Sequence, residues 1–266
     1  MSEDIEAEIR AALRDVLMGK LRPGRDGTEA LEEVAGAAYF EAAATGAFDL
    51  PFTPELVPDE SIAQVDVFDL RHEQPPKQTK SKIVGGRTLM RDPKSIDAIM
   101  LHQTAVDYGD GDPRQRARAE KIPYHTMVFR EGWVVLSRPV RSYTNHGGWG
   151  NSRSIGIGVE GLYPGLIGGS VWGSKPETPI NAETLAALTE ALKRTVALAR
   201  AEGCPLKYLI AHRQSSKMRR SDPGEALWMA ALPVAESLGL QAQPDWTIDD
   251  GKPIPEAWGG SKGSRY

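Results

Sequence analysis

Short apolar runs alternate with amphipathic stretches between residues 98 and 238, and this alternation restricts the fold more than any other feature of the sequence. The runs 98–101 and 208–211 have the length of buried strands. A long helix with one apolar face is predicted between them from Leu185, Leu188, Leu192 and Val196. Strands interleaved with helices favour the α/β class, with a central mixed β-sheet covered by helices.

Further elements of this region fit the same class. Residues 125–129 and 133–136 flank the turn Arg130-Glu131-Gly132, which predicts a β-hairpin. A strand is also predicted over residues 154–160 and a helix over residues 113–120.

A last helix is predicted from Pro223 to Leu238. Pro223 suits the first turn of a helix, where a missing backbone N–H costs nothing. Asp222 would then stand at the start of that helix and be held in place. Pro233 predicts a kink or a break further along.

The chain divides into three parts. We expect residues 1–80 to form a helical N-terminal region and connector, residues 85–240 to form the main domain, and residues 241–266, rich in Gly, Pro and Ser, to form an irregular tail. Proline-rich residues 50–80 are expected to be an extended connector and not a packed element. Two amphipathic helices are predicted before it, one from Ile5, Ile9, Leu13 and Leu17 and one from Thr28 towards Gly46.

Composition excludes several classes of function. With 32 basic and 36 acidic residues the formal charge is −4, so nothing favours a nucleic-acid partner. No apolar run reaches the roughly 18–20 residues of a membrane span. The acidic start lacks the features of a signal peptide, so we expect synthesis in the cytoplasm. Cys204 is the single cysteine, which excludes an intrachain disulfide and predicts a buried thiol.

Two histidines and one aspartate are candidates for a metal site. His102 and His212 directly follow the two apolar runs, and side chains at the ends of neighbouring strands can converge on one point. Asp222 follows His212 by ten positions. Three such ligands with one open position make a catalytic zinc site. Taken singly, a histidine after a strand is more often a structural residue, and an Asp before Pro is usually a helix cap.

Four separated motifs, in order, resemble the zinc-dependent N-acetylmuramoyl-L-alanine amidase family. This family comprises phage lysozyme-type amidases, cytosolic muropeptide amidases and animal peptidoglycan-recognition proteins. The resemblance covers about residues 95–240 and does not reach residues 1–80. The motifs are residues 99–105 (IMLHQTA), 124–132 (YHTMVFREG), 146–156 (HGGWGNSRSIG) and 212–224 (HRQSSKMRRSDPG).

The resemblance implies that His102, His212 and Asp222 are ligands of a Zn²⁺ ion. It implies that Tyr124 lies beside the metal as a catalytic residue. Arg220 stands where the family usually has a catalytic lysine; it keeps the positive charge but cannot act as a base.

Like Arg220, the predicted strand 154–160 differs from the family's usual sequence. Gly158 occupies the position of a catalytic glutamate in the cytosolic relatives. Glu160 lies two residues further and on the same face, roughly 6.5–7 Å away. Two roles stay open for Glu160: a catalytic carboxylate that acts through a water, or a carboxylate that pairs with an arginine or caps the strand.

The glycine-rich loop that begins at His146 is interpreted as a wall of the substrate groove. His146 would lie near the metal, and Trp149 would stack on a sugar or peptide; a flexible turn is the alternative. His125 is interpreted as structural, because it is expected to point away from the face of Tyr124.

The implied function is hydrolysis of the amide bond between N-acetylmuramic acid and L-alanine in bacterial peptidoglycan. The alternative is a binding module of the same fold that recognises peptidoglycan or muropeptides without cleaving them. The N-terminal region favours a phage lysin or a delivered effector over a cytosolic recycling enzyme, so we expect action on the cell wall after release or delivery. Residues 1–80 would contact the wall or a carrier, or pack on the catalytic domain.

Overall fold

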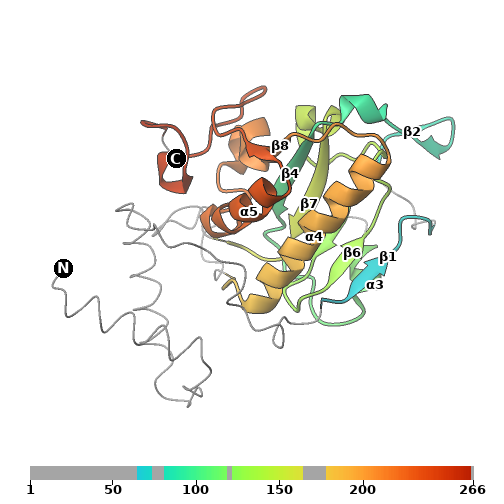
Figure 1. Cartoon of the computed structure of the whole chain (residues 1–266). Helices are drawn as coiled ribbons and strands as arrows, with labels where there is room; N and C mark the ends of the chain where they lie inside the picture. Colours follow the sequence, from blue (N-terminus) through green and yellow to red (C-terminus); the bar gives the residue numbers. More distant parts are fainter. Residues whose placement is uncertain (1–64, 74–80, 119–121, 164–177, 265–266) are drawn as a thin grey trace, which may run out of the picture. The chain divides into compact units, whose positions relative to one another are not determined.

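The computed structural model describes residues 65–73, 81–118, 122–163 and 178–264 (Figure 1). All of these residues belong to the second of the two units into which the chain divides, residues 61–266. The two helices predicted before residue 50 lie outside the described residues.

A seven-stranded mixed sheet forms the centre of the described fold, in the order β1-β6-β5-β7-β4-β8-β9. The pair β5–β6 is antiparallel, and every other neighbouring pair in this sheet is parallel. A separate hairpin pairs β2 (Ile83–Val84) with β3 (Arg87–Thr88). The strands of the large sheet are β1 (Val67–Asp69), β4 (Ala98–Gln103), β5 (Thr126–Val128), β6 (Val134–Leu136), β7 (Ser154–Val159), β8 (Tyr208–Ala211) and β9 (Gln241–Ala242).

Two long helices lie across one face of this sheet, α4 (Ala182–Ala201) and α5 (Glu225–Ser237) (Figure 1). The Asn181 side chain begins α4 by accepting a hydrogen bond from the Thr184 N–H, as helix-capping residues do. The short helix α3 (Pro113–Ala117) contributes Ala117 to the apolar cluster of Tyr124 and Met127, which is separate from the cluster under α4. Short 3-10 helices complete the fold: η2 (Pro93–Ser95), η3 (Gly148–Ser152), η4 (His212–Ser215), η5 (Lys217–Arg219) and η6 (Glu256–Trp258).

Side chains along β4 point alternately to the two faces of the sheet, which determines the face on which His102 lies. Ile99 and Leu101 are buried in the core under α4 and α5, whereas Ala98 and Met100 belong to a separate cluster. Side chains alternate between the faces of a strand, so His102 projects from the face of Met100, away from the two long helices.

The α/β class and the mixed sheet are confirmed, as are the strands and helices predicted between residues 98 and 238. The start of the last helix was predicted wrongly. The helix begins at Glu225 with Gly224 as its cap, so Pro223 precedes the first turn. Of the kink or break expected at Pro233, the break does not occur, because the helix continues through this residue. None of the described helices is long and apolar enough to cross a membrane.

The main domain extends beyond residues 85–240 at both ends. Residues 67–69 had been assigned to the connector, but they form the edge strand β1 and pair with β6. Residues 241–266 had been expected to be irregular, yet β9 joins the sheet, and Ile254 and Trp258 are fully buried in the main core. The structure of both segments depends on contacts with the sheet and core that they join. Local sequence patterns do not encode such contacts.

The core under α4 makes a direct prediction about stability. Leu192 is fully buried in this core, whereas Leu185 on the same helix is 37% exposed. Leu192→Ala is expected to lower the free energy of unfolding by about 2–5 kcal/mol, because it removes buried methyl groups and leaves a cavity. Leu185→Ala, the matched control, should change it by no more than about 0.5 kcal/mol. Urea unfolding measures both changes. Equal losses in the two variants would contradict the assignment of Leu192 to the buried face of α4.

Candidate metal centre

The parallel pairing of β4 with β8 brings His102 and His212 together. Leu101 lies opposite Ala211 in the register, so the histidines are the next residues on neighbouring strands. Their ring centroids lie 4.4 Å apart. This confirms the expected convergence at the ends of these two strands.

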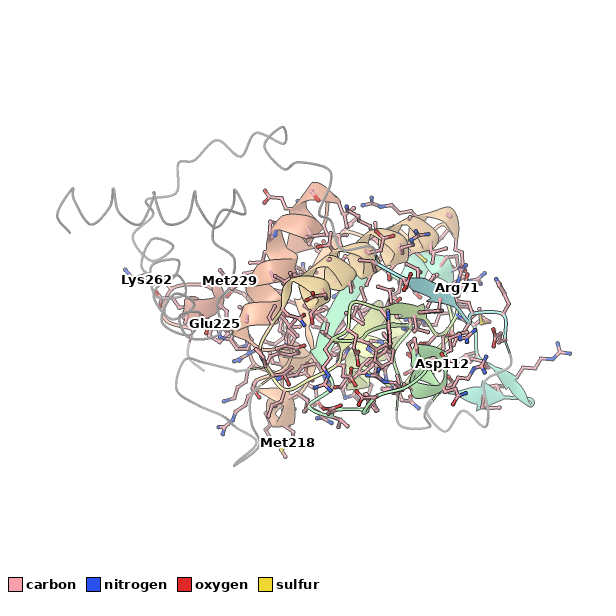
Figure 2. All side chains as sticks on the ribbon, turned by 90° about the horizontal axis from the view of Figure 1, so that it is seen from below. Arg71, Asp112, Met218, Glu225, Met229 and Lys262 are labelled. Carbon is pink, nitrogen blue, oxygen red and sulfur yellow. The ribbon has the colours of Figure 1, made fainter. Side chains whose placement is uncertain are left out.

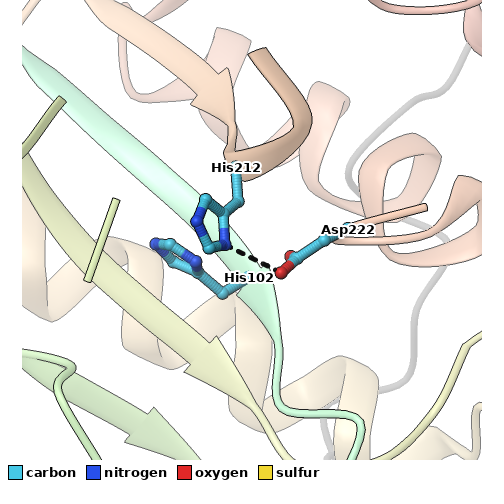
Figure 3. A group of neighbouring side chains, drawn as sticks. All are labelled: His102, His212 and Asp222. Atoms are coloured by element: carbon cyan, nitrogen blue, oxygen red, sulfur yellow. Dashed lines mark hydrogen bonds and ion pairs between the residues drawn. The ribbon is translucent and has the colours of Figure 1, made fainter. Parts of the chain in front are cut away.

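Asp222 reaches the same point through a loop that folds back on β8. The Arg213 N–H donates to the Asp222 carbonyl at 2.9 Å, which closes the loop next to His212. One Asp222 carboxylate oxygen, Oδ2, lies 2.8 Å from His212 Nδ1 (Figure 3). The other, Oδ1, accepts a hydrogen bond from the backbone N–H of Gln103 at 2.9 Å.

These three side chains form a compact group that could hold a metal ion. One ligand atom from each of His102, His212 and Asp222 lies within 4.8 Å of the other two (Figure 3). Nδ1 of His102 is buried and has no hydrogen-bond partner among the residues that the structure describes. Burial lowers the pKa of His102 well below its usual value, and the neighbouring His212 adds to this shift. The imidazole is therefore neutral near pH 7, as a metal ligand must be.

A hydrogen-bonded chain behind His102 defines which of its nitrogens is free. Nε2 of His146 lies 3.3 Å from the Ser154 carbonyl, which only accepts, so this nitrogen carries the proton. Nδ1 of His146 then accepts from Nε2 of His102, 3.0 Å away. The remaining nitrogen of His102, Nδ1, keeps its lone pair. Such a partner fixes the tautomer of a metal-binding histidine.

The burial of His146 corrects part of its predicted role. Its side chain lies near the candidate metal ligands, as expected, but the residue is only 4% exposed. It is therefore a hydrogen-bond partner of His102 and not an exposed groove wall. Burial, with the charge of Arg91 as the next cause, lowers the pKa of His146 to about 3, so its ring is neutral.

Trp149 lies on the 3-10 helix η3 of the same loop and is 68% exposed. This exposure agrees with the exposed aromatic expected from the sequence. Met218 on η5 is also largely exposed and points outward (Figure 2).

Tyr124 packs beside the candidate metal ligands. Its ring centroid lies 4.8 Å from that of His102, and the residue is buried. Arg138 donates to the Tyr124 carbonyl at 2.8 Å and fixes the backbone there. Burial, reinforced by the negative charge of Asp222, raises the pKa of Tyr124 well above 10. The phenol therefore keeps its proton and is a hydrogen-bond donor.

Two glycines of β7 make room for these rings. A Cβ atom at Gly158 would lie 2.2 Å from Cδ2 of Tyr124, and one at Gly156 would lie 2.7 Å from Nδ1 of His146. Both contacts are too short for any side chain. Gly158 thus gives its space to the tyrosine ring, which explains why no carboxylate occupies this position.

Glu160 takes the second of the two roles that the sequence left open, because it pairs with an arginine. The residue is fully buried, and both of its carboxylate oxygens accept hydrogen bonds from Nη2 of Arg116, at 2.8 and 2.6 Å. The Tyr108 N–H also donates to Glu160 at 2.7 Å. These bonds hold the segment that carries α3 against the end of β7.

Arg220 is exposed, and its carbonyl accepts a hydrogen bond from Arg213. The adjacent Arg219 acts on the site through its charge. Burial is the main cause of the shifted pKa values of His102 and Tyr124, and the charge of Arg219 lowers both. The sequence directed attention to Arg220 alone, because only that position matched a motif.

Other residues of the site were missed, namely Arg116, Arg213 and Gln214. They are buried and hydrogen-bonded to partners far away in the sequence, so no local pattern marks them. His125 is buried, accepts from the Gly156 N–H at 3.0 Å and lies 2.9 Å from the Ser142 carbonyl, contacts that suit the structural role expected for it. It does not point away from the site as expected, because its ring centroid lies 5.4 Å from that of His146. Cys204 is buried and free, also as predicted.

Comparison with known families gives one match. The family model Amidase_2, described as N-acetylmuramoyl-L-alanine amidase, matches residues 92–225. This range is about half of the chain and contains His102, Tyr124, His212 and Asp222. No curated protein matches the sequence.

Several solved structures are similar to this chain at low identity. N-acetylmuramoyl-L-alanine amidase LysC from Clostridium intestinale URNW is 17% identical, with a TM-score of 0.42 over 67% of this chain and 100% of that chain. The Ph2119 endolysin from a Thermus scotoductus bacteriophage is 21% identical, with a TM-score of 0.41 over 66% and 99%. Drosophila PGRP-LB is 16% identical, with a TM-score of 0.44 over 67% and 97%.

The contact between Gly158 and Tyr124 predicts a steric coupling. Gly158→Ala should lower the free energy of unfolding by about 1–3 kcal/mol, because the added methyl group overlaps the tyrosine ring. When Tyr124 is also changed to Ala, the overlap disappears, so the double variant should lose less than the sum of the two single losses by at least about 0.5 kcal/mol. Denaturant unfolding of the four proteins gives this cycle, and additive losses would show that the ring does not need the glycine.

Proposed function

Because this chain belongs to the N-acetylmuramoyl-L-alanine amidase family, we propose that it is a zinc-dependent hydrolase of the amide bond between N-acetylmuramic acid and L-alanine. The observation that carries this proposal is the complete buried ligand group of His102, His212 and Asp222. A module that only bound peptidoglycan would not need three metal ligands held together in this way.

The donor set fits zinc. Two imidazoles and one carboxylate are typical of zinc sites that keep a position open for water. The unpartnered Nδ1 of His102 supports this fit, since a buried acceptor with nothing to accept from is costly unless a cation takes its place. A zinc ion held there by His102, His212 and Asp222 would supply a water of lowered pKa and would polarise the carbonyl of the scissile amide.

The side chains around the ligands stabilise the charge that develops on the carbonyl oxygen. Tyr124 keeps its proton at neutral pH and donates a hydrogen bond to this oxygen. Arg219, whose charge already acts on the site, and Arg220 supply positive charge from the exposed side. A guanidinium cannot take up a proton, so neither arginine is the base.

Hydrolysis adds water across the amide. The hydroxyl group goes to the lactyl carbonyl carbon, the bond to the L-alanine nitrogen breaks, and the nitrogen receives a proton. We assign delivery of this proton to Tyr124, which passes its phenolic proton to the nitrogen and takes up the proton that the attacking water loses, so that the phenol ends the reaction protonated. Glu160 is assigned a positioning role, since its carboxylate oxygens are occupied by Arg116 and Tyr108.

The partner of this site is the wall polymer or a muropeptide derived from it. Exposed Trp149, on the loop that begins at His146, offers a flat apolar face to a sugar or peptide. We further propose action on the cell wall as a phage lysin or a delivered effector.

A binding module without hydrolysis is the second candidate. The absent carboxylate at Gly158 and the arginine in place of a catalytic lysine favour it. The ligand group and the proton-bearing Tyr124 favour hydrolysis, and we therefore place it first.

The test is the chemistry of the products. Purified peptidoglycan treated with the protein should release peptides with a new N-terminal L-alanine, detected by mass spectrometry, and sugars with a free lactyl carboxylate. A chelator should abolish release and added Zn²⁺ should restore it. His102→Ala should lose at least about 100-fold, because one of three ligands is gone.

The matched control is His125→Asn, which alters a buried histidine outside the ligand group and should retain release in proportion to the folded fraction. Release that is insensitive to the chelator, or unchanged in His102→Ala, would reject zinc hydrolysis. Binding of the polymer with no new amino terminus would favour the binding module.

A further inference from the structure

The family match ends at residue 225, but the chain continues and returns to the metal ligands. Residues 243–258, here named the C-terminal segment, pack against residues 212–222, here named the ligand loop because they begin at His212 and end at Asp222. The sequence had assigned the C-terminal segment to an irregular tail with no role in the site.

Gln214 makes the densest set of contacts between the two segments. Its side-chain Nε2 donates to the carbonyls of Gln243, Trp246 and Pro244 at 2.6, 2.7 and 3.3 Å. Its own carbonyl accepts from the Ile248 N–H at 2.9 Å. The other end of the same side chain, Oε1, accepts from the Ala211 N–H at 2.8 Å, directly before the ligand His212.

Arg213 makes a second set of contacts, and it is fully buried. Its Nε donates to the Pro253 carbonyl at 3.0 Å, and its carbonyl accepts from the Lys252 N–H at 2.8 Å. Its Nη1 donates to the Arg220 carbonyl within the ligand loop. The guanidinium lies 5.0 Å from the centre of the buried Trp258 ring. Arg213 thus joins both ends of the ligand loop to the C-terminal segment.

The middle of the C-terminal segment touches the ligand loop backbone to backbone. A Cβ atom at Gly251 would lie 2.0 Å from the Gln214 carbonyl oxygen, so only glycine allows this approach. Next to it, Asp250 accepts from the Lys217 N–H at 3.1 Å and pairs with the Lys217 ammonium at 3.2 Å.

We propose that the C-terminal segment is a positioning element of the metal centre, which sets the separation and orientation of His212 and Asp222. This inference rests on the proposed function, since it takes these residues to be metal ligands. A loop that carries two metal ligands binds a metal tightly only if the loop is already ordered. If folding has not ordered it, metal binding must do so, and the conformational entropy lost in that step lowers the affinity.

Residues 217–220 of the ligand loop are exposed. Gln103 of β4 holds the end of the loop, because it donates to the Ser221 carbonyl and to the Asp222 carboxylate. The hydrogen bonds to the C-terminal segment hold the start and middle of the loop, at Arg213, Gln214 and Lys217. Weakening of such supporting contacts lowers metal affinity by about 10- to 100-fold in proteins generally.

The experiment compares metal binding by the full-length protein and three variants of the C-terminal segment. Gly251→Ala pushes the segment off the Gln214 backbone and should weaken Zn²⁺ binding by about 10- to 100-fold, measured by competition with a coloured chelator. Asp250→Ala removes one exposed pair and one backbone hydrogen bond, so a loss of about 2- to 5-fold is expected. The visible absorption of bound Co²⁺ should also shift in Gly251→Ala, which reports an altered ligand arrangement.

Asp245→Ala is the matched control for Asp250→Ala. Asp245 lies in the same segment but accepts from the Ser261 hydroxyl, not from the ligand loop. This variant should bind Zn²⁺ as the parent does, with an unchanged Co²⁺ spectrum. Thermal unfolding of the metal-free proteins confirms that Asp250→Ala and Asp245→Ala are folded, so the comparison does not depend on Gly251→Ala alone.

The outcomes separate this inference from the function on which it rests. If the parent binds Zn²⁺ and all three variants bind it equally well, the positioning role is rejected and the metal centre stands. Equal weakening in Asp250→Ala and Asp245→Ala would also reject it, because the effect would not follow the contact. A parent that binds no Zn²⁺ overturns the proposed function, and this inference with it.

Discussion

The parallel hydrogen bonding between β4 and β8 is the interaction on which the rest of the site depends. It places the residues after Leu101 and Ala211 side by side, so that His102 and His212 meet without any help from a loop. The third candidate ligand comes from the segment that follows β8. Asp222 does so in a loop closed by one backbone hydrogen bond from Arg213.

The strand on the other side of β4, β7, has glycines where the side chains of the site need space. β7 pairs with β4 in parallel, and its glycines at 156 and 158 leave space for the rings of His146 and Tyr124. The histidine fixes the tautomer of His102, and the tyrosine brings a proton that burial keeps in place. A carboxylate at position 158 and a tyrosine ring at position 124 would compete for one volume, so the chain carries one of them.

Much of this could be predicted from the sequence, for identifiable reasons. Regular apolar runs and helical spacing marked β4, β8 and α4, and the ends of two buried strands indicated that His102 and His212 converge. The edge strand β1 could not be predicted, because three residues among prolines take their structure from β6. The ion pair of Glu160 was open for a similar reason, since Arg116 lies 44 positions away and only folding brings it near. The burial of the C-terminal segment is the largest omission, because a Gly- and Pro-rich stretch shows no period.

We propose that His102, His212 and Asp222 bind one metal ion together. A crystal grown with Zn²⁺ and measured on both sides of the zinc absorption edge tests this. We expect a single strong anomalous peak at about 2.0–2.2 Å from one nitrogen of each histidine and one oxygen of Asp222. A peak bound by other residues, or no peak among these three side chains at saturating Zn²⁺, would contradict it.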